Sequence, residues 1–144
     1  MKKQALRAIT ALSFIFALTA VSASAQTERK RGINIPFSFT VGTKTLPAGR
    51  YRVEPHRGDS DRVWLVQSTD GRASALVMTM SAQARTTPED TKLVFHRYGD
   101  QYFLSQIWTP GGNTGRELLM PHLERELANR ADKGQTVVLA GGGN

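Results

Sequence analysis

The chain has 144 residues, a formal net charge of +7 and no cysteine. The missing cysteine excludes disulfides, thiolate metal sites and cysteine nucleophiles, so packing alone must hold the fold together. A chain of this length forms one domain and buries about two-thirds of its unfolded surface, which is enough for a hydrophobic core.

The first 25 residues have the pattern of a secretory signal peptide. Three cations stand among the first seven residues, residues 8–21 form an uncharged apolar run, and residues 23–25 (Ala-Ser-Ala) match a cleavage site. The apolar run is shorter than the roughly 20 residues of a membrane anchor. We therefore expect residues 1–25 to be removed, which lowers the formal charge to +4. We expect a periplasmic or secreted protein with no transmembrane span after cleavage.

The next segment, residues 26–32, is polar and basic, and we predict a flexible arm there. Its run Arg29-Lys30-Arg31 could touch an acidic surface, but it is shorter than a usual basic tract, which favours a solubilising linker. We predict a β-rich domain over residues 33–140 and a flexible tail over residues 141–144.

Two strands are predicted in the first part of this domain. Residues 33–41 alternate apolar side chains with Ser and Thr, the period of two that is typical of a strand with one buried face. After two turns, residues 50–54 predict a second strand with Tyr51 and Val53 directed inward.

Residues 35–53, with the sequence IPFSFTVGTKTLPAGRYRV, resemble the opening of a family of small exported bacterial proteins. The general form of that opening is IPF-x-F-x-V-G-x-x-x-LPAG-x-Y-x-V. Further parts of the family pattern are similar to residues 70–72 (DGR), 92–100 (KLVFHRYGD) and 115–118 (GREL). The function of the family is uncharacterised, so the resemblance implies an exported β-rich domain and no catalytic residues.

A hairpin is predicted over residues 62–80, around the turn at Asp70-Gly71. Pairing Thr69 with Arg72 places apolar side chains on both faces of this hairpin. One face carries Val63, Leu65, Leu76 and Met78, and the other carries Trp64, Val66, Ala75 and Val77. A hairpin with one wet face alternates apolar and polar residues, so this pattern predicts cover on both sides.

A second hairpin is predicted over residues 92–108, around Gly99-Asp100, where glycine supplies the positive φ that a tight turn needs. With Tyr98 opposite Gln101, the ladder continues through the pairs Arg97–Tyr102, His96–Phe103, Phe95–Leu104, Val94–Ser105 and Leu93–Gln106. Both faces are again largely apolar, so we predict a central position with cover on both sides.

The chain ends with a predicted helix over residues 121–133 and a strand over residues 136–140. Leu123, Leu127 and Ala131 fall on one stripe of that helix and are predicted to face the sheet. Together these elements predict a mainly β fold: a single-domain antiparallel β-sandwich or small barrel of about seven strands, with one C-terminal helix.

The sequence contains no recognisable catalytic or metal-binding motif. His122 and Glu126 share one helix face, but a metal site needs three or four ligands, so we predict no metal and no cofactor. No serine lies in a Gly-x-Ser-x-Gly elbow, and the Gly-rich residues 111–115 lack the Gly-Lys-Ser/Thr ending of a phosphate loop. The sequence therefore favours a non-enzymatic protein, with a small hydrolase that has no recognisable motif as an alternative.

The favoured function is an exported binding or structural module of the bacterial envelope. Its predicted basic face is made by four residues, Arg50, Arg52, Arg57 and Arg62. This face suits an anionic envelope component or another envelope protein, and we expect no nucleic acid because an exported protein meets little of it.

A second interpretation is a carrier that holds a small apolar ligand in a β-barrel cavity. The residues predicted to line this cavity are Phe37, Phe39, Tyr102 and Trp108. Neither interpretation identifies the ligand, the partner or the oligomeric state.

Overall fold

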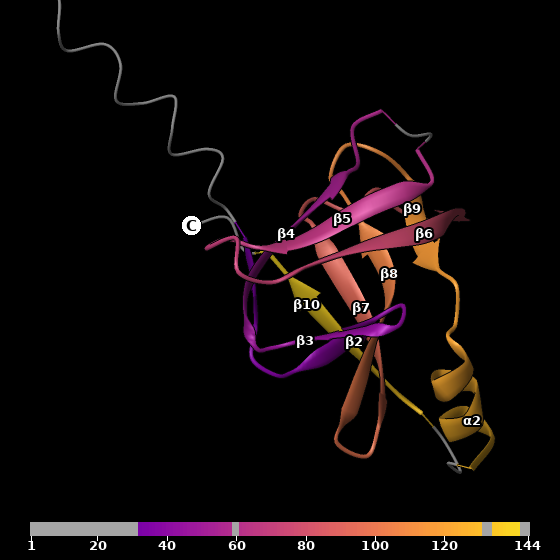
Figure 1. Cartoon of the computed structure of the whole chain (residues 1–144). Coiled ribbons are helices and arrows are strands. Elements are labelled where there is room, and N and C mark those ends of the chain that lie inside the picture. Colours follow the sequence, from indigo (N-terminus) through magenta and orange to yellow (C-terminus); the bar gives the residue numbers. More distant parts are fainter. Residues whose placement is uncertain (1–31, 59–60, 131–133, 142–144) are drawn as a thin grey trace, which may run out of the picture. The chain divides into compact units, whose positions relative to one another are not determined.

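The computed structural model describes residues 32–58, 61–130 and 134–141 (Figure 1). The predicted signal peptide, the arm up to residue 31 and the tail residues 142–144 lie outside this described part. The described residues form ten strands and one helix, α2 (His122–Arg130). The strands are β1 (Ile33–Ile35), β2 (Phe39–Val41), β3 (Lys44–Leu46), β4 (Gly49–Pro55), β5 (Val63–Ser68), β6 (Ser74–Gln83), β7 (Lys92–Tyr98), β8 (Gln101–Trp108), β9 (Thr114–Leu118) and β10 (Gln135–Ala140).

All ten strands belong to one open sheet. Its main path runs β1-β4-β5-β6-β9-β8-β2-β3, and β7 pairs with both β8 and β10. The mainly β class with one C-terminal helix is confirmed. A closed barrel is wrong, because the strands do not close into a ring, and a single sheet takes the place of a two-sheet sandwich.

The sheet also has more strands than the predicted seven, and it is mixed. β1, β2 and β3 have only three residues each, too few for a periodic pattern to mark each of them separately. β8 shares one edge between two partners: β9 pairs with Gln106 and Ile107, and β2 pairs in parallel at Phe103. The parallel pair arises because the β2–β3 hairpin fills the part of the β8 edge that β9 leaves open.

The hydrophobic core lies on the inner face of this sheet. The ring of Phe39 packs edge-on against Tyr51 and Phe95, with ring centroids 5.0 and 5.5 Å apart. All three side chains are buried, and the Tyr51 hydroxyl donates a hydrogen bond of 2.7 Å to the carbonyl of Pro47. Edge-to-face packing suits the charge distribution of aromatic rings, and the hydrogen bond satisfies the buried hydroxyl.

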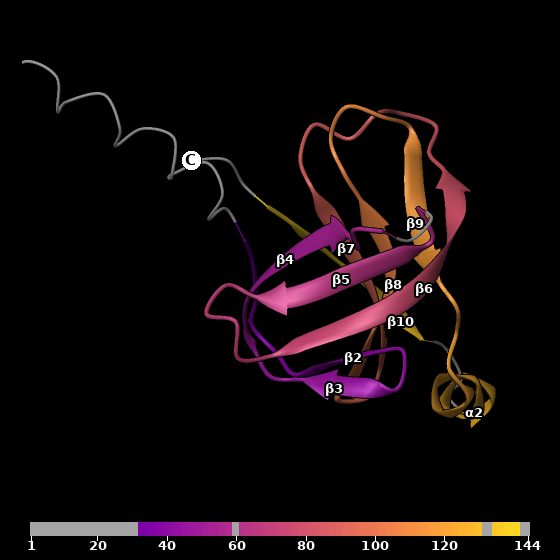
Figure 2. The same ribbon diagram turned by 45° about the horizontal axis from the view of Figure 1, so that its top comes forward.

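The β5–β6 hairpin has the predicted register, with Val63 opposite Met78 and Leu65 opposite Leu76. Its inner face is buried, but Met78 on the outer face is 61% exposed. The prediction of cover on both sides is therefore wrong for this hairpin. In both Figure 1 and Figure 2, α2 lies beside the sheet and not over β4 or β5.

The β7–β8 hairpin keeps the predicted register only near its turn. The pairs from Tyr98–Gln101 to Phe95–Leu104 are as predicted, but Val94 then pairs with Gln106. Ser105 is the extra residue of a β-bulge, so the predicted pairs of Val94 with Ser105 and of Leu93 with Gln106 are wrong. The bulge shifts the alternation by one residue and turns Ile107 into the core.

The helix α2 begins directly after Pro121, as the proline predicts. Its buried residue is Glu124, whereas Leu123 is 51% exposed and Leu127 is half-buried. The predicted stripe is therefore wrong at Leu123, and residue 131 lies outside the described part. The helix turns Glu124 inward because the sheet surface beneath it presents hydrogen-bonding side chains. Within residues 32–58, 61–130 and 134–141, no helix is long and apolar enough to cross a membrane.

Candidate functional site

A group of exposed apolar side chains lies on β6 and on the connection from β9 to α2. Their exposed fractions range from 42% to 61%. We call this group the apolar face, and it consists of Leu76, Met78, Met80, Leu119 and Met120. Soluble monomers rarely expose contiguous apolar patches larger than a few hundred Å², and larger patches mark interaction sites.

The apolar face follows from the alternation of β6. Ala75, Val77 and Thr79 point inward and are buried, so Leu76, Met78 and Met80 must point outward. On the neighbouring strand β5, the half-buried Leu65 and Val63 lie opposite Leu76 and Met78. The apolar surface therefore extends over two strands.

A cleft of about 320 Å³ lies at one end of the apolar face. Met78, Met80 and Leu119 line it, together with Arg62 just before β5. The same face therefore has side chains that protrude and a hollow that could receive one.

The four arginines of the predicted basic face lie on β4, in the β4–β5 connection and just before β5. Arg50 and Arg52 point outward from β4, and the Arg52 guanidinium donates a hydrogen bond of 3.1 Å to Gln67 Oε1. Arg57 is exposed in the β4–β5 connection, and Arg62 lines the cleft. The structure thus places Arg62 beside the apolar face, whereas Arg50 lines a separate cleft with Asp70 and Arg72.

Acidic side chains border the same face. Glu54 lies on β4 opposite Leu65, and Glu117 lies on β9 opposite Met80. Both are exposed. The border of the apolar face therefore carries charges of both signs.

A second group of functional side chains lies where α2 meets the β7–β8 hairpin. Glu124 is 2% exposed, and its Oε1 lies 2.7 Å from His96 Nδ1 and 3.4 Å from the Tyr98 hydroxyl. Burial, and secondarily the neighbouring Glu124 carboxylate, raises the pKa of Tyr98 above its ordinary value. This cluster was not predicted from the sequence, because His96 and Glu124 are 28 residues apart and no spacing pattern connects them.

A small cleft of about 110 Å³ adjoins this cluster, and His96, Ser105 and Glu124 all line it. These are the residue types of a serine hydrolase, in which an acid orients the histidine that activates the serine. The acid–histidine contact is present, but Ser105 makes no hydrogen bond to His96 in this structure.

No metal centre forms among the described residues. His122 Nδ1 lies 3.4 Å from Glu126 Oε1, as their spacing predicts. Within the described ranges, no group of three or more His, Asp and Glu side chains is placed to hold a metal ion.

The four residues of the predicted apolar cavity pack into the protein in different ways. Phe37 stacks on Tyr102 with ring centroids 3.7 Å apart, and Phe39 is buried in the core. Trp108 lies against Gly115, where an added side chain would meet its ring. The barrel on which the carrier interpretation depends is absent, because the sheet is open.

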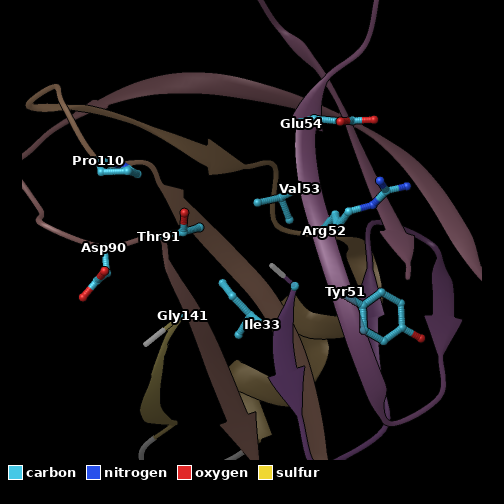
Figure 3. Close-up of a pocket in the computed structure, with 10 residues that line it drawn as sticks. Ile33, Tyr51, Arg52, Val53, Glu54, Asp90, Thr91, Pro110 and Gly141 are labelled. Carbon is cyan, nitrogen blue, oxygen red and sulfur yellow. The ribbon is translucent and has the colours of Figure 1, made fainter. Parts of the chain in front are cut away.

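A cleft of about 300 Å³ opens instead between the β1–β4 pair and the residues around Thr91 and Pro110 (Figure 3). Ile33 and Val53 point toward this cleft, whereas the Arg52 guanidinium points away from it (Figure 3).

Comparison with protein-family models, curated proteins and solved structures found no match to this chain. The functional argument therefore depends on the geometry of these surfaces.

Proposed function

We propose that the protein is an exported, non-enzymatic binding module of the bacterial envelope that contacts another protein through the apolar face. The observation that carries this proposal is the exposure of Met78, at 61%, among apolar neighbours on a sheet face. An outer sheet face that meets only water normally carries polar residues. Methionine side chains are flexible and polarisable, which suits them to contact with another protein surface. The signal-peptide pattern in residues 1–25 supports export.

The composition of the exposed surface favours a protein partner over a lipid one. Among the described residues, the large apolar side chains that are exposed are Leu, Met and Val, without an aromatic residue. Surfaces that lie in a membrane interface use Trp or Phe together with an excess of Lys and Arg. Here Glu54 and Glu117 stand beside the arginines, which lowers attraction to an anionic lipid surface or polyanion.

The test compares two matched substitutions in protein purified from the envelope of the producing cell. Met78→Glu places a charge in the apolar face, and Val138→Glu places the same charge on β10 at a similar exposure of 55%. After cross-linking with a photoreactive diazirine reagent, which inserts into C–H bonds, we expect wild type and Val138→Glu to recover the same partner, cross-linked through residues 76–80 or 119–120. Met78→Glu should lose that partner. Equal recovery by all three proteins would remove the proposal.

A small hydrolase is the second candidate function, because His96, Ser105 and Glu124 line one cleft. The test is covalent labelling by a fluorophosphonate probe, which reacts with activated serines. Labelling of wild type that disappears in Ser105→Ala would support a hydrolase. A wild-type protein that remains unlabelled would exclude it.

A further inference from the structure

We propose that the partner of the apolar face is the same face of a second copy of this chain, so that two copies pack sheet against sheet about a two-fold axis. This inference rests on the proposed function, because it names the partner of the same surface. It follows from the register of the four strands β4, β5, β6 and β9.

The centre of the proposed contact is the point where β5 and β6 present their outward side chains. Val63, Leu65, Leu76 and Met78 form a square there, since Val63 is opposite Met78 and Leu65 is opposite Leu76. Two sheets that pack face to face lie about 10 Å apart and interdigitate their side chains. This square is the part of the face where apolar side chains of both strands could interdigitate with a second sheet.

Charged side chains of opposite sign lie on the two sides of the central square. Arg52 lies one strand beyond β5, level with Gln67 and Ser74, which is two residues before Leu76. Glu117 lies one strand beyond β6, level with Met80, which is two residues after Met78. Arg52 and Glu117 are therefore at opposite corners of the face, each one strand and two residues away from the central square.

A two-fold axis that lies in the interface, at right angles to this diagonal, places Arg52 of one copy opposite Glu117 of the second copy, and this contact occurs twice. A two-fold contact uses one patch twice, so it needs both signs of charge on that patch. A partner of one sign would suit only the arginines or only the glutamates. The mixed border therefore favours a second copy as the occupant.

The first test is the mass of the protein in solution, measured by light scattering and by sedimentation at several concentrations. We expect a dimer for wild type and for Val138→Glu, and a monomer for Met78→Glu at the same concentration. Circular dichroism and a thermal melt show whether Met78→Glu remains folded. A monomeric wild type at tens of micromolar overturns the inference, and so does a dimer that Met78→Glu leaves unchanged.

The second test examines the corner contact by charge exchange. Arg52→Glu and Glu117→Arg should each weaken the dimer about 5- to 50-fold, because each places like charges opposite one another. The double variant Arg52→Glu/Glu117→Arg should recover most of the affinity. If the dimer of the double variant is weakened by the sum of the two single effects, the proposed axis is wrong. Substitutions at independent sites have additive effects on affinity, whereas substitutions at paired charges compensate one another.

These outcomes separate the inference from the proposed function. If wild type is monomeric but Met78→Glu still loses an envelope partner, the binding function stands and its partner is a different protein. If Met78→Glu loses neither a partner nor the dimer, both proposals fail.

Discussion

The two long hairpins of this protein have the same sequence signature and different surroundings. Both turn at a glycine with positive φ, Gly71 at 75° and Gly99 at 64°, and both have apolar side chains on their two faces. On the β7–β8 hairpin, Phe103 shares the outer face with His96 and is 1% exposed. On the β5–β6 hairpin, the outer Met78 remains exposed. An apolar pattern on both faces of a hairpin therefore does not by itself show that the chain covers both of them.

The cover of the β7–β8 hairpin also shows how α2 is attached. The helix is joined to the sheet by the buried Glu124, which contacts His96 and Tyr98, while its Leu123 stays exposed. A buried carboxylate must have hydrogen-bonding partners, so this contact has a more specific geometry than a leucine stripe would have. The outer face of β5–β6 has no such polar side chain at its centre, which fits contact with another apolar surface.

The largest effect on stability is expected from a substitution on the buried inner face that the two hairpins share. Phe95→Ala should lower the free energy of unfolding by about 3–5 kcal/mol, because Phe95 is fully buried and its removal leaves a cavity. Urea denaturation at low protein concentration measures this loss. A change below about 1 kcal/mol would mean that the core is not packed around Phe95.

The contact that covers the β7–β8 hairpin should have the next largest effect. Glu124→Ala should lower the free energy of unfolding by about 1–3 kcal/mol, because it leaves the buried side of His96 without its partner. Amide hydrogen exchange in residues 122–130 should become faster, since the helix loses its attachment. Glu124→Gln, which keeps a hydrogen-bonding group, is the matched control and should lose less. Unchanged exchange in Glu124→Ala would contradict this role.

Alkaline pH offers a reversible way to weaken the same contact. Burial and the Glu124 carboxylate raise the pKa of Tyr98 above its unfolded value of about 10. The stability that the neutral Tyr98 hydroxyl contributes is therefore fully present below pH 10. It is lost as the pH rises through the pKa of Tyr98 in the folded protein. Thermal melts between pH 9 and pH 11.5 should show a fall in Tm that is smaller in Tyr98→Phe. Since burial also raises the pKa of Tyr51, part of the fall should remain in that variant. An identical fall in both proteins would contradict this assignment.

The smallest effect on stability is expected on the outer face of β5–β6. Leu76→Thr and Met78→Thr, made together, should change the free energy of unfolding of the dilute monomer by no more than about 0.5 kcal/mol per site. Both side chains are exposed there, so little buried area is lost. Binding of a hydrophobic dye should decrease at the same time. A loss of several kcal/mol would show that another part of the chain covers this face.

Much of the local structure could be predicted from the sequence. Glycine tolerates a positive φ, so the hairpin turns at Asp70-Gly71 and Gly99-Asp100 were predicted correctly. The register of β5–β6 followed from its turn, because the turn decides which residues lie opposite one another. The inward positions of Phe39 and Tyr51 followed from alternation with polar neighbours.

The candidate surfaces were less predictable, since they depend on residues that are distant in the chain. The arginines at positions 50, 52, 57 and 62 were proposed from the sequence, but their positions relative to the apolar side chains depend on strand pairing. The bulge at Ser105 has no signal in the sequence, and it reversed the expected side of Ile107. Charge and hydropathy patterns describe each strand, and they do not state which strand becomes its neighbour.

By itself, the sequence determined the mainly β class, the two glycine turns and the side of each early strand that enters the core. These depend on φ preferences and on the two-residue period of a strand, which act between near neighbours. Only the tertiary structure decided that Glu124 covers the β7–β8 hairpin while Met78 of the β5–β6 hairpin remains exposed. The physical reason is that cover depends on contacts between segments far apart in the chain, which neighbouring residues do not specify.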